Sequence, residues 1–129
     1  MRPATRVTEP VVHGIPNCDT VKRARAWLAA QGVTYRWHDF RKSGVPADRL
    51  DAWLAGSQAA RLLNRNGSTW RGLDDPARAS AESSAGLRAL LLAQPSLIRR
   101  PVVDWGVTTT VGFDAAQWSA LLAQHPAAR

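Results

Sequence analysis

The amino-acid sequence predicts an α/β fold of thioredoxin-like topology, and three observations lead to this prediction. The N-terminal part of the chain reads as strand, helix and strand, the middle reads as helices alone, and the C-terminal part reads as two short strands and a helix. A strand–helix–strand unit gives parallel strands with a right-handed crossover, whereas two strands joined by a short turn are antiparallel. We therefore expect a mixed sheet of about four strands (β-α-β, then β-β-α), flanked by helices and carrying an all-helical insertion.

The first strand–helix–strand unit follows residues 1–9, which we expect to be a flexible leader. The apolar run from Val11 to Gly14 predicts a strand. Apolar residues then recur at helical spacing from Asp19 onwards, until Gly32 supplies a stop. Apolar and polar residues alternate over 33–38, which is typical of a strand with one buried face.

The middle of the chain predicts an insert of helices over about 46–94, within a single domain over 10–129. Pro46 suits a first helical position, and Asp75 suits the N-cap of a third helix. Ser57 suits the N-cap of a short second helix through Leu62 and Leu63, which ends around Asn66-Gly67. Ser83 or Ser84 can cap a further helix, which ends before Pro95.

The C-terminal part predicts a β-hairpin and a last helix. Val102 and Val103 begin one strand, Gly106 marks the turn, and the β-branched run 107–111 forms the antiparallel partner. Asp114 with Gln117 resembles a capping box at the start of the last helix.

Composition narrows the classes of function. The formal net charge is +7 and 15 of the 17 basic residues are arginine, yet they are spread along the chain without a basic run, so direct nucleic-acid binding is not expected. No stretch is long and apolar enough for a membrane span, so we expect a cytoplasmic protein with no membrane partner. The single cysteine excludes an internal disulfide and fits a reducing compartment. No metal or tightly bound cofactor is implied.

The single cysteine, Cys18, falls where the first strand turns into the first helix. Backbone N–H groups at a helix start lack partners and the helix dipole is positive there, so an anionic sulfur is favoured. Asp19 acts against this, because a neighbouring carboxylate disfavours a second negative charge. The alternative is an inert buried cysteine, but the flanking polar turn residues favour a reactive one.

Three motifs in collinear order over residues 11 to about 122 resemble the ArsC-related YffB proteins. They are Gly14-Ile15-Pro16-Asn17-Cys18-Asp19-Thr20, Leu62-Leu63-Asn64 leading into Gly67-Ser68-Thr69-Trp70-Arg71, and Pro95-Ser96-Leu97-Ile98-Arg99-Arg100-Pro101-Val102. The resemblance implies a thioredoxin-like fold with a helical insert. It also extends to the glutathione- and glutaredoxin-linked arsenate reductases and to the Spx transcription regulators.

The resemblance also implies roles for particular residues. Arg100 matches an arginine that holds an oxyanion near the catalytic cysteine, and Pro101 matches the proline that is cis in thioredoxin-like folds. Arg65 is the nearest match to a second anion-binding arginine, although Asn64 fits the same position if the register moves by one residue. A third arginine of the arsenate reductases falls near Gly112-Phe113, where this chain has none. This puts efficient arsenate reduction in doubt.

Several of these residues have an alternative, purely structural interpretation. Arg100 could stabilise the end of a helical turn, and Arg65 could be a solvated loop charge. His13 and His38 fall on expected strands, where a structural role is favoured over a catalytic one.

The predicted function is therefore a thiol-dependent oxidoreductase in which Cys18 and Arg100 are catalytic. Asn17, Arg65, Trp70 and Pro101 are the expected residues for binding substrate or glutathione. Position 21 is Val21 in place of a second cysteine, so an external thiol, glutathione or glutaredoxin, must resolve the intermediate. The substrate would be an oxidised thiol or a small oxyanion. The alternatives are an Spx-like regulator that binds RNA polymerase without catalysis, and a true arsenate reductase.

Overall fold

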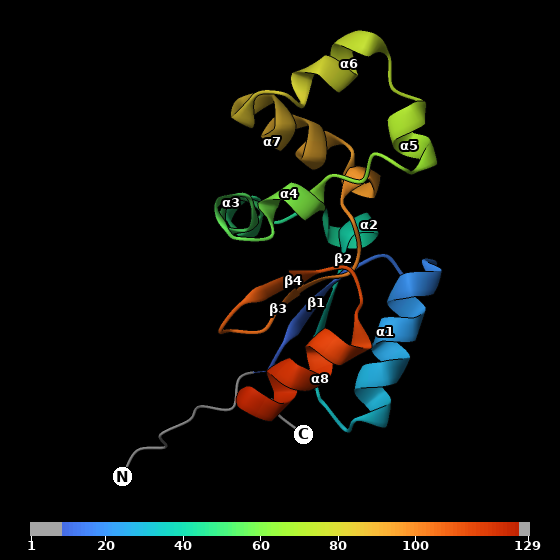
Figure 1. The fold of residues 1–129 in the computed structure, drawn as a ribbon. Coiled ribbons are helices and arrows are strands. Elements are labelled where there is room, and N and C mark those ends of the chain that lie inside the picture. Colours follow the sequence, from blue (N-terminus) through green and yellow to red (C-terminus); the bar gives the residue numbers. More distant parts are fainter. Residues whose placement is uncertain (1–8, 127–129) are drawn as a thin grey trace. The chain divides into compact units, whose positions relative to one another are not determined.

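A computed structural model describes residues 9–126 of the chain, which forms two compact units (Figure 1). The sheet unit comprises Met1–Asp39 and Arg100–Arg129, of which 9–39 and 100–126 are described, and the helical unit comprises Phe40–Arg99. Except for Glu9, the expected leader over 1–9 lies outside the described residues.

The sheet unit contains a four-stranded mixed sheet, as the sequence predicts. Strand β1 pairs with β2 in parallel and with β3 antiparallel, and β3 pairs with β4 antiparallel. The order across the sheet is β2-β1-β3-β4. The strands are β1 (Val11–Gly14), β2 (Arg36–Asp39), β3 (Val102–Asp104) and β4 (Thr109–Val111). This is the thioredoxin-like arrangement of a β-α-β unit followed by a β-hairpin and a helix.

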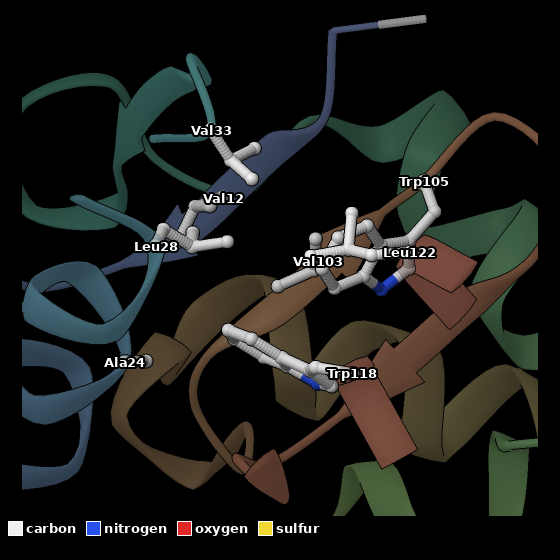
Figure 2. Close-up of a cluster of buried hydrophobic side chains, with 8 residues drawn as sticks. All are labelled: Val12, Ala24, Leu28, Val33, Val103, Trp105, Trp118 and Leu122. Atoms are coloured by element: carbon white, nitrogen blue, oxygen red, sulfur yellow. The ribbon is translucent and has the colours of Figure 1, made fainter. Parts of the chain in front are cut away.

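Helices α1 (Asp19–Ala30) and α8 (Ala115–Gln124) pack on one face of this sheet. Figure 2 shows the shared core, in which Trp118 of α8 lies beneath side chains of both central strands. Trp118 is fully buried and makes edge-to-face contacts with Trp105, Trp27 and Phe113. The core cluster consists of Val12, Ala24, Leu28, Val33, Val103, Trp105, Trp118 and Leu122. Burial of each large apolar side chain contributes about 1.5–3 kcal/mol.

The end of α1 explains why β2 is shorter than the alternating pattern predicts. Gly32 has a positive φ of 71°, and the N–H of Val33 donates to the carbonyl of Leu28 at 3.0 Å. This six-to-one hydrogen bond is the Schellman closure of a helix. Val33 closes the end of the helix with its N–H and packs in the core with its side chain. The strand predicted over 33–38 therefore begins only at Arg36.

The helical unit begins earlier than the predicted bound at residue 46. It contains one additional turn at its start, α2 (Phe40–Ser43), and a second isolated turn, α5 (Ser68–Arg71). Neither was predicted, because a four-residue helix has no apolar repeat to detect. The remaining elements are α3 (Ala47–Ala55), α4 (Ala59–Leu62), α6 (Asp75–Ser80), α7 (Ser84–Ala93) and η1 (Pro95–Leu97).

Several helix ends in this unit differ from the predicted ones by one residue. Pro46 is the N-cap of α3, whereas the sequence predicts it at the first helical position. Gln58, and not Ser57, is the N-cap of α4. The helix ends at Leu62, before the predicted end around Asn66-Gly67, because Leu63 is extended and forms a β-bridge with Ile98. Asp74 caps α6, because its carboxylate accepts from the N–H of Ala77 at 2.9 Å, so the prediction for Asp75 was wrong. Ser83 is the N-cap of α7, which confirms one of the two predicted candidates.

The helical unit has its own apolar core and one prominent ion pair. Arg88 of α7 donates to both carboxylate oxygens of Asp51 on α3, at 2.6 and 3.3 Å. The Phe40 and Trp53 rings are in contact, with centroids 6.4 Å apart. The fully or almost fully buried side chains are Phe40, Leu50, Trp53, Leu62, Leu91, Leu97 and Ile98. Within residues 9–126, no helix combines the length and apolar character that a membrane crossing requires.

Candidate functional site

Cys18 lies at the start of α1, where the sequence predicts it, and is the N-cap residue of that helix. Its backbone is extended, with φ of −104° and ψ of 124°, and its carbonyl accepts the hydrogen bond from the N–H of Lys22 at 2.9 Å. Its thiol is free and half-buried, and it makes no capping hydrogen bond to the first turn. The sulfur is therefore attached at the positive end of a helix of 12 residues while solvent still reaches the residue.

The register of the sheet brings Arg100 and Pro101 to the same end of the unit as Cys18. His13 on β1 lies opposite Val102 on β3, so the end of β1 at Gly14 adjoins the start of β3 at Pro101. Only residues 15–17 separate Gly14 from Cys18. A connection of four residue steps spans at most about 14 Å. Cys18 and the Arg-Pro motif therefore belong to one corner of the sheet unit.

The Arg100–Pro101 peptide bond is cis, which confirms what the resemblance implies for Pro101. The carbonyl of Pro101 accepts a hydrogen bond from the N–H of Gly112 at 2.9 Å. Gly112 is buried and has a positive φ of 87°, a conformation that favours glycine. The adjacent Phe113 packs its ring against Trp118, with centroids 4.8 Å apart. The position expected for a third arginine is thus occupied by a conformationally specialised glycine and an aromatic residue of the core.

Other predicted site residues are placed as follows. Asn17 is exposed and directly precedes Cys18, whereas Arg100 is half-buried. Arg65 and Trp70 belong to the helical unit, where the Arg65 guanidinium lies over the Trp70 ring, 5.3 Å from its centroid. Their roles toward Cys18 stay predictions.

Asn64, the alternative to Arg65, is engaged in its own turn. Its side-chain oxygen accepts from the N–H of Asn66 at 3.0 Å. Arg65 is exposed and carries the charge that an anion-binding position requires. Which of the two residues binds an anion stays a prediction.

His13 has a structural role, as the sequence favours. It is 2% exposed, and its Nδ1–H donates to the carbonyl of Val102 at 3.0 Å. Its ring also lies against that of His38, with centroids 5.3 Å apart. His13 thus ties β1 to the residue that follows Pro101. This contact was missed at the level of sequence, because only the register of β1 on β3 reveals it. In residues 9–126, no three His, Cys, Asp or Glu residues converge as metal ligands.

The ArsC family model matches residues 13–121. The chain belongs to the ArsC family. Among solved structures, a protein named YffB (PA3664) is 40% identical, with a TM-score of 0.81 over 86% of this chain and 96% of that one. An arsenate reductase (ArsC) related protein from Brucella melitensis is 42% identical, with a TM-score of 0.68 over 88% of this chain and 93% of that one.

A curated relative of this ArsC-family chain is the global transcriptional regulator Spx of Streptococcus pyogenes. It is 26% identical over 84% of this chain and 81% of its own length. The ArsC family therefore relates this chain both to proteins named for arsenate reduction and to transcriptional regulators.

Proposed function

We propose that the protein is a thiol-dependent reductase that uses Cys18 as its nucleophile and glutathione as its reductant. The observation that carries this proposal is the position of Cys18 at the start of α1, in the corner of the sheet unit that also contains Arg100 and cis Pro101. A helix start stabilises an attacking thiolate, and an arginine beside it stabilises the anions that enter and leave. Membership of the ArsC family supports the same chemistry.

The proposed cycle reduces a mixed disulfide between glutathione and a client thiol. The Cys18 thiolate attacks the glutathione sulfur, the client sulfur–sulfur bond breaks, and the client leaves as a thiolate that takes up a proton. A second glutathione thiolate then attacks the Cys18–glutathione disulfide, which releases oxidised glutathione and restores the Cys18 thiolate. Overall, the mixed disulfide and one incoming glutathione thiol become the client thiol and oxidised glutathione, so the client sulfur is reduced and the incoming glutathione sulfur is oxidised. The second step requires an external thiol, supplied directly or through glutaredoxin. Position 21, where a second cysteine could resolve the disulfide internally, is a fully buried valine.

Arg100 and the backbone beside Pro101 are the proposed binding elements for glutathione. A guanidinium can donate two parallel hydrogen bonds to one glutathione carboxylate. Because the Pro101 carbonyl already accepts from Gly112, an extended pairing with the glutathione peptide falls on the Arg100 side of the proline. Asn17, exposed and directly before Cys18 in the chain, offers an amide for binding glutathione.

A deglutathionylation assay tests this proposal. Purified protein is mixed with a glutathionylated peptide and glutathione, and release of the peptide thiol is followed over time. We expect Cys18→Ser to abolish turnover and Arg100→Gln to lower the rate at limiting glutathione at least about tenfold. The matched control is Arg36→Gln, which removes an exposed charge from β2 and should leave the rate unchanged. Full turnover by Cys18→Ser would remove the basis of the proposal.

A second candidate is a regulator of the Spx type that contacts RNA polymerase, favoured by the similarity to Spx. It predicts capture of RNA polymerase by the immobilised protein, with equal yield from wild type and Cys18→Ser. Capture without thiol turnover would support this candidate over the reductase.

Arsenate reduction is the third candidate, and the structure of the Pro101 corner disfavours it. Gly112 holds a positive φ, so an arginine there would be strained, and Phe113 is engaged in the core. We expect arsenate-dependent oxidation of glutathione to be much slower than reduction of the glutathionylated peptide in the same assay.

A further inference from the structure

The helical unit carries four arginines that no carboxylate neutralises. Arg61 and Arg65 flank the end of α4, Arg71 ends α5, and Arg99 follows η1. Within the described residues, no carboxylate lies within ion-pair distance of these four arginines, which we call the arginine group. Charged side chains on a surface usually alternate in sign, so a set of one sign generates a positive potential.

The acidic residues nearest in sequence to the arginine group are engaged elsewhere. Asp75 pairs with Arg78 at 2.8 Å, and Asp74 caps α6 through the N–H of Ala77. The positive charge therefore remains available to another molecule.

Three of the four arginines are held in place by their own unit. Arg71 donates from Nη1 to the carbonyl of Asn66, and Arg99 donates from Nε to the carbonyl of Arg61 at 3.0 Å. Arg65 lies over the ring of Trp70. A guanidinium fixed through one edge keeps its other N–H groups for a ligand and loses less entropy when it binds.

A backbone bridge brings the segment that contains Arg99 next to the segment that contains Arg61 and Arg65. Leu63 and Ile98 form an antiparallel bridge, the N–H of Arg99 donates to the carbonyl of Leu62, and the side chains of Thr69 and Ser96 are 3.0 Å apart. Four residue steps separate Arg61 from Arg65, which limits their Cα separation to about 14 Å. Side chains on one face of an extended peptide recur about every 7 Å. Acidic residues two or four positions apart in such a peptide are therefore about 7 or about 14 Å apart, which lies within this limit.

The same observations disfavour a nucleic acid as the ligand. Duplex recognition usually employs a basic helix in a groove, but the only basic residue of α7 is Arg88, which is paired with Asp51. Single-strand recognition usually employs open aromatic faces, and the Arg65 guanidinium already lies over one face of the Trp70 ring, 5.3 Å from its centroid. What remains is a set of guanidinium forks, which match carboxylates and phosphates alike, so the preference for an acidic protein rests on the missing basic helix and open aromatic platform in the helical unit.

We propose that the arginine group binds an acidic, extended segment of a partner protein. This interaction does not require the Cys18 thiol and goes beyond the reductase function proposed above, and it assigns Arg65, which the family resemblance matches to an anion-binding residue, to the partner segment. Affinity arises from several paired charges and falls as salt screens them.

The test measures fluorescence anisotropy of a labelled peptide of alternating glutamate and serine, with the full-length protein at low salt. We expect Arg61→Gln/Arg65→Gln to weaken binding about tenfold, because it removes two charges without removing a hydrogen bond to the backbone. The matched control is Arg23→Gln/Arg36→Gln, which removes two exposed charges from the sheet unit and should change binding less than twofold. Circular dichroism checks that each variant is folded.

Two outcomes would overturn the proposal. Equal weakening by the two double variants would mean that net charge alone attracts the peptide. A single-stranded oligonucleotide of equal charge that binds more tightly than the peptide, with the same dependence on Arg61 and Arg65, would identify a nucleic acid as the ligand. Tenfold weakening confined to Arg61→Gln/Arg65→Gln and to the peptide supports an acidic protein partner.

Discussion

A second thiol introduced at position 21 should convert the protein from external to internal resolution of its mixed disulfide. Val21 is fully buried one turn after Cys18, and it packs so near Gly14 that a Cβ there would lie 3.0 Å from its Cγ2. The Cβ atoms of residues three apart on a helix are about 5–6 Å apart. Disulfides join residues whose Cα atoms are about 4.4–6.8 Å apart, and the backbone at a helix end can adjust to bring two residues into that range. Val21→Cys therefore places a thiol within reach of the sulfur on Cys18.

The cost of Val21→Cys should be small, because the replacement keeps most of the buried volume. We estimate a loss of about 1 kcal/mol, which compares with a total stability of about 5–15 kcal/mol for a domain. The thermal midpoint should fall by only about 4 °C. The effective concentration of a thiol on the same helix exceeds that of free glutathione, so internal attack should dominate.

The assay is mass spectrometry of the intact protein after brief exposure to oxidised glutathione. Wild type should gain one glutathione on Cys18, and the Val21→Cys variant should instead lose two hydrogens as an internal disulfide forms. The control Val21→Ala, which is also smaller but has no thiol, should keep the glutathione adduct. A stable adduct on Val21→Cys at the wild-type level would refute the placement of Cys18 at the N-cap and Val21 in the first turn of α1.

Three further predictions concern stability. Trp118→Ala should lower the free energy of unfolding by about 3–5 kcal/mol, measured by urea denaturation, because the indole is fully buried. Asp114→Ala should cost about 1 kcal/mol in the same measurement, since it removes the acceptor for the N–H of Gln117. The Arg88 guanidinium holds the pKa of Asp51 below 3.8, so the pair stabilises the fold above that pH and the effect disappears as pH falls through the lowered pKa. The thermal midpoints of wild type and Asp51→Asn should converge in acid.

The sequence predicts the elements around Cys18 well because their signals are local. The apolar run of β1, the helical spacing of α1 and the left-handed stop at Gly32 are each set by neighbouring residues. Apolar and polar residues alternate from residue 33 onwards, so the sequence predicts a strand from that point. The late start of β2 was missed because Val33 donates the hydrogen bond that closes the end of α1. Asp74 and Asp75 are both good caps, and only the fold selects Asp74.

The candidate site was less accessible to sequence reasoning. Resemblance identified Cys18, Arg100 and Pro101, but composition and spacing alone place Cys18 only. The hydrogen bond from Gly112 to Pro101 joins residues on either side of a β-hairpin, and its existence depends on strand register. Long-range pairing of this kind leaves no periodic signal in a single sequence.

The central pairing of β1 with β3 also has a consequence for biosynthesis. His13 and Val102 are hydrogen-bonded partners 89 positions apart, and the whole helical unit lies between them in the chain. A ribosome must therefore release the helical unit before β3 can close the sheet beside β1. Non-local contacts of this separation form slowly, while units with local contacts fold early. The nascent chain carries the Cys18 thiol throughout that interval, and the corner that contains Cys18 and Pro101 is completed only when the last quarter of the protein has emerged.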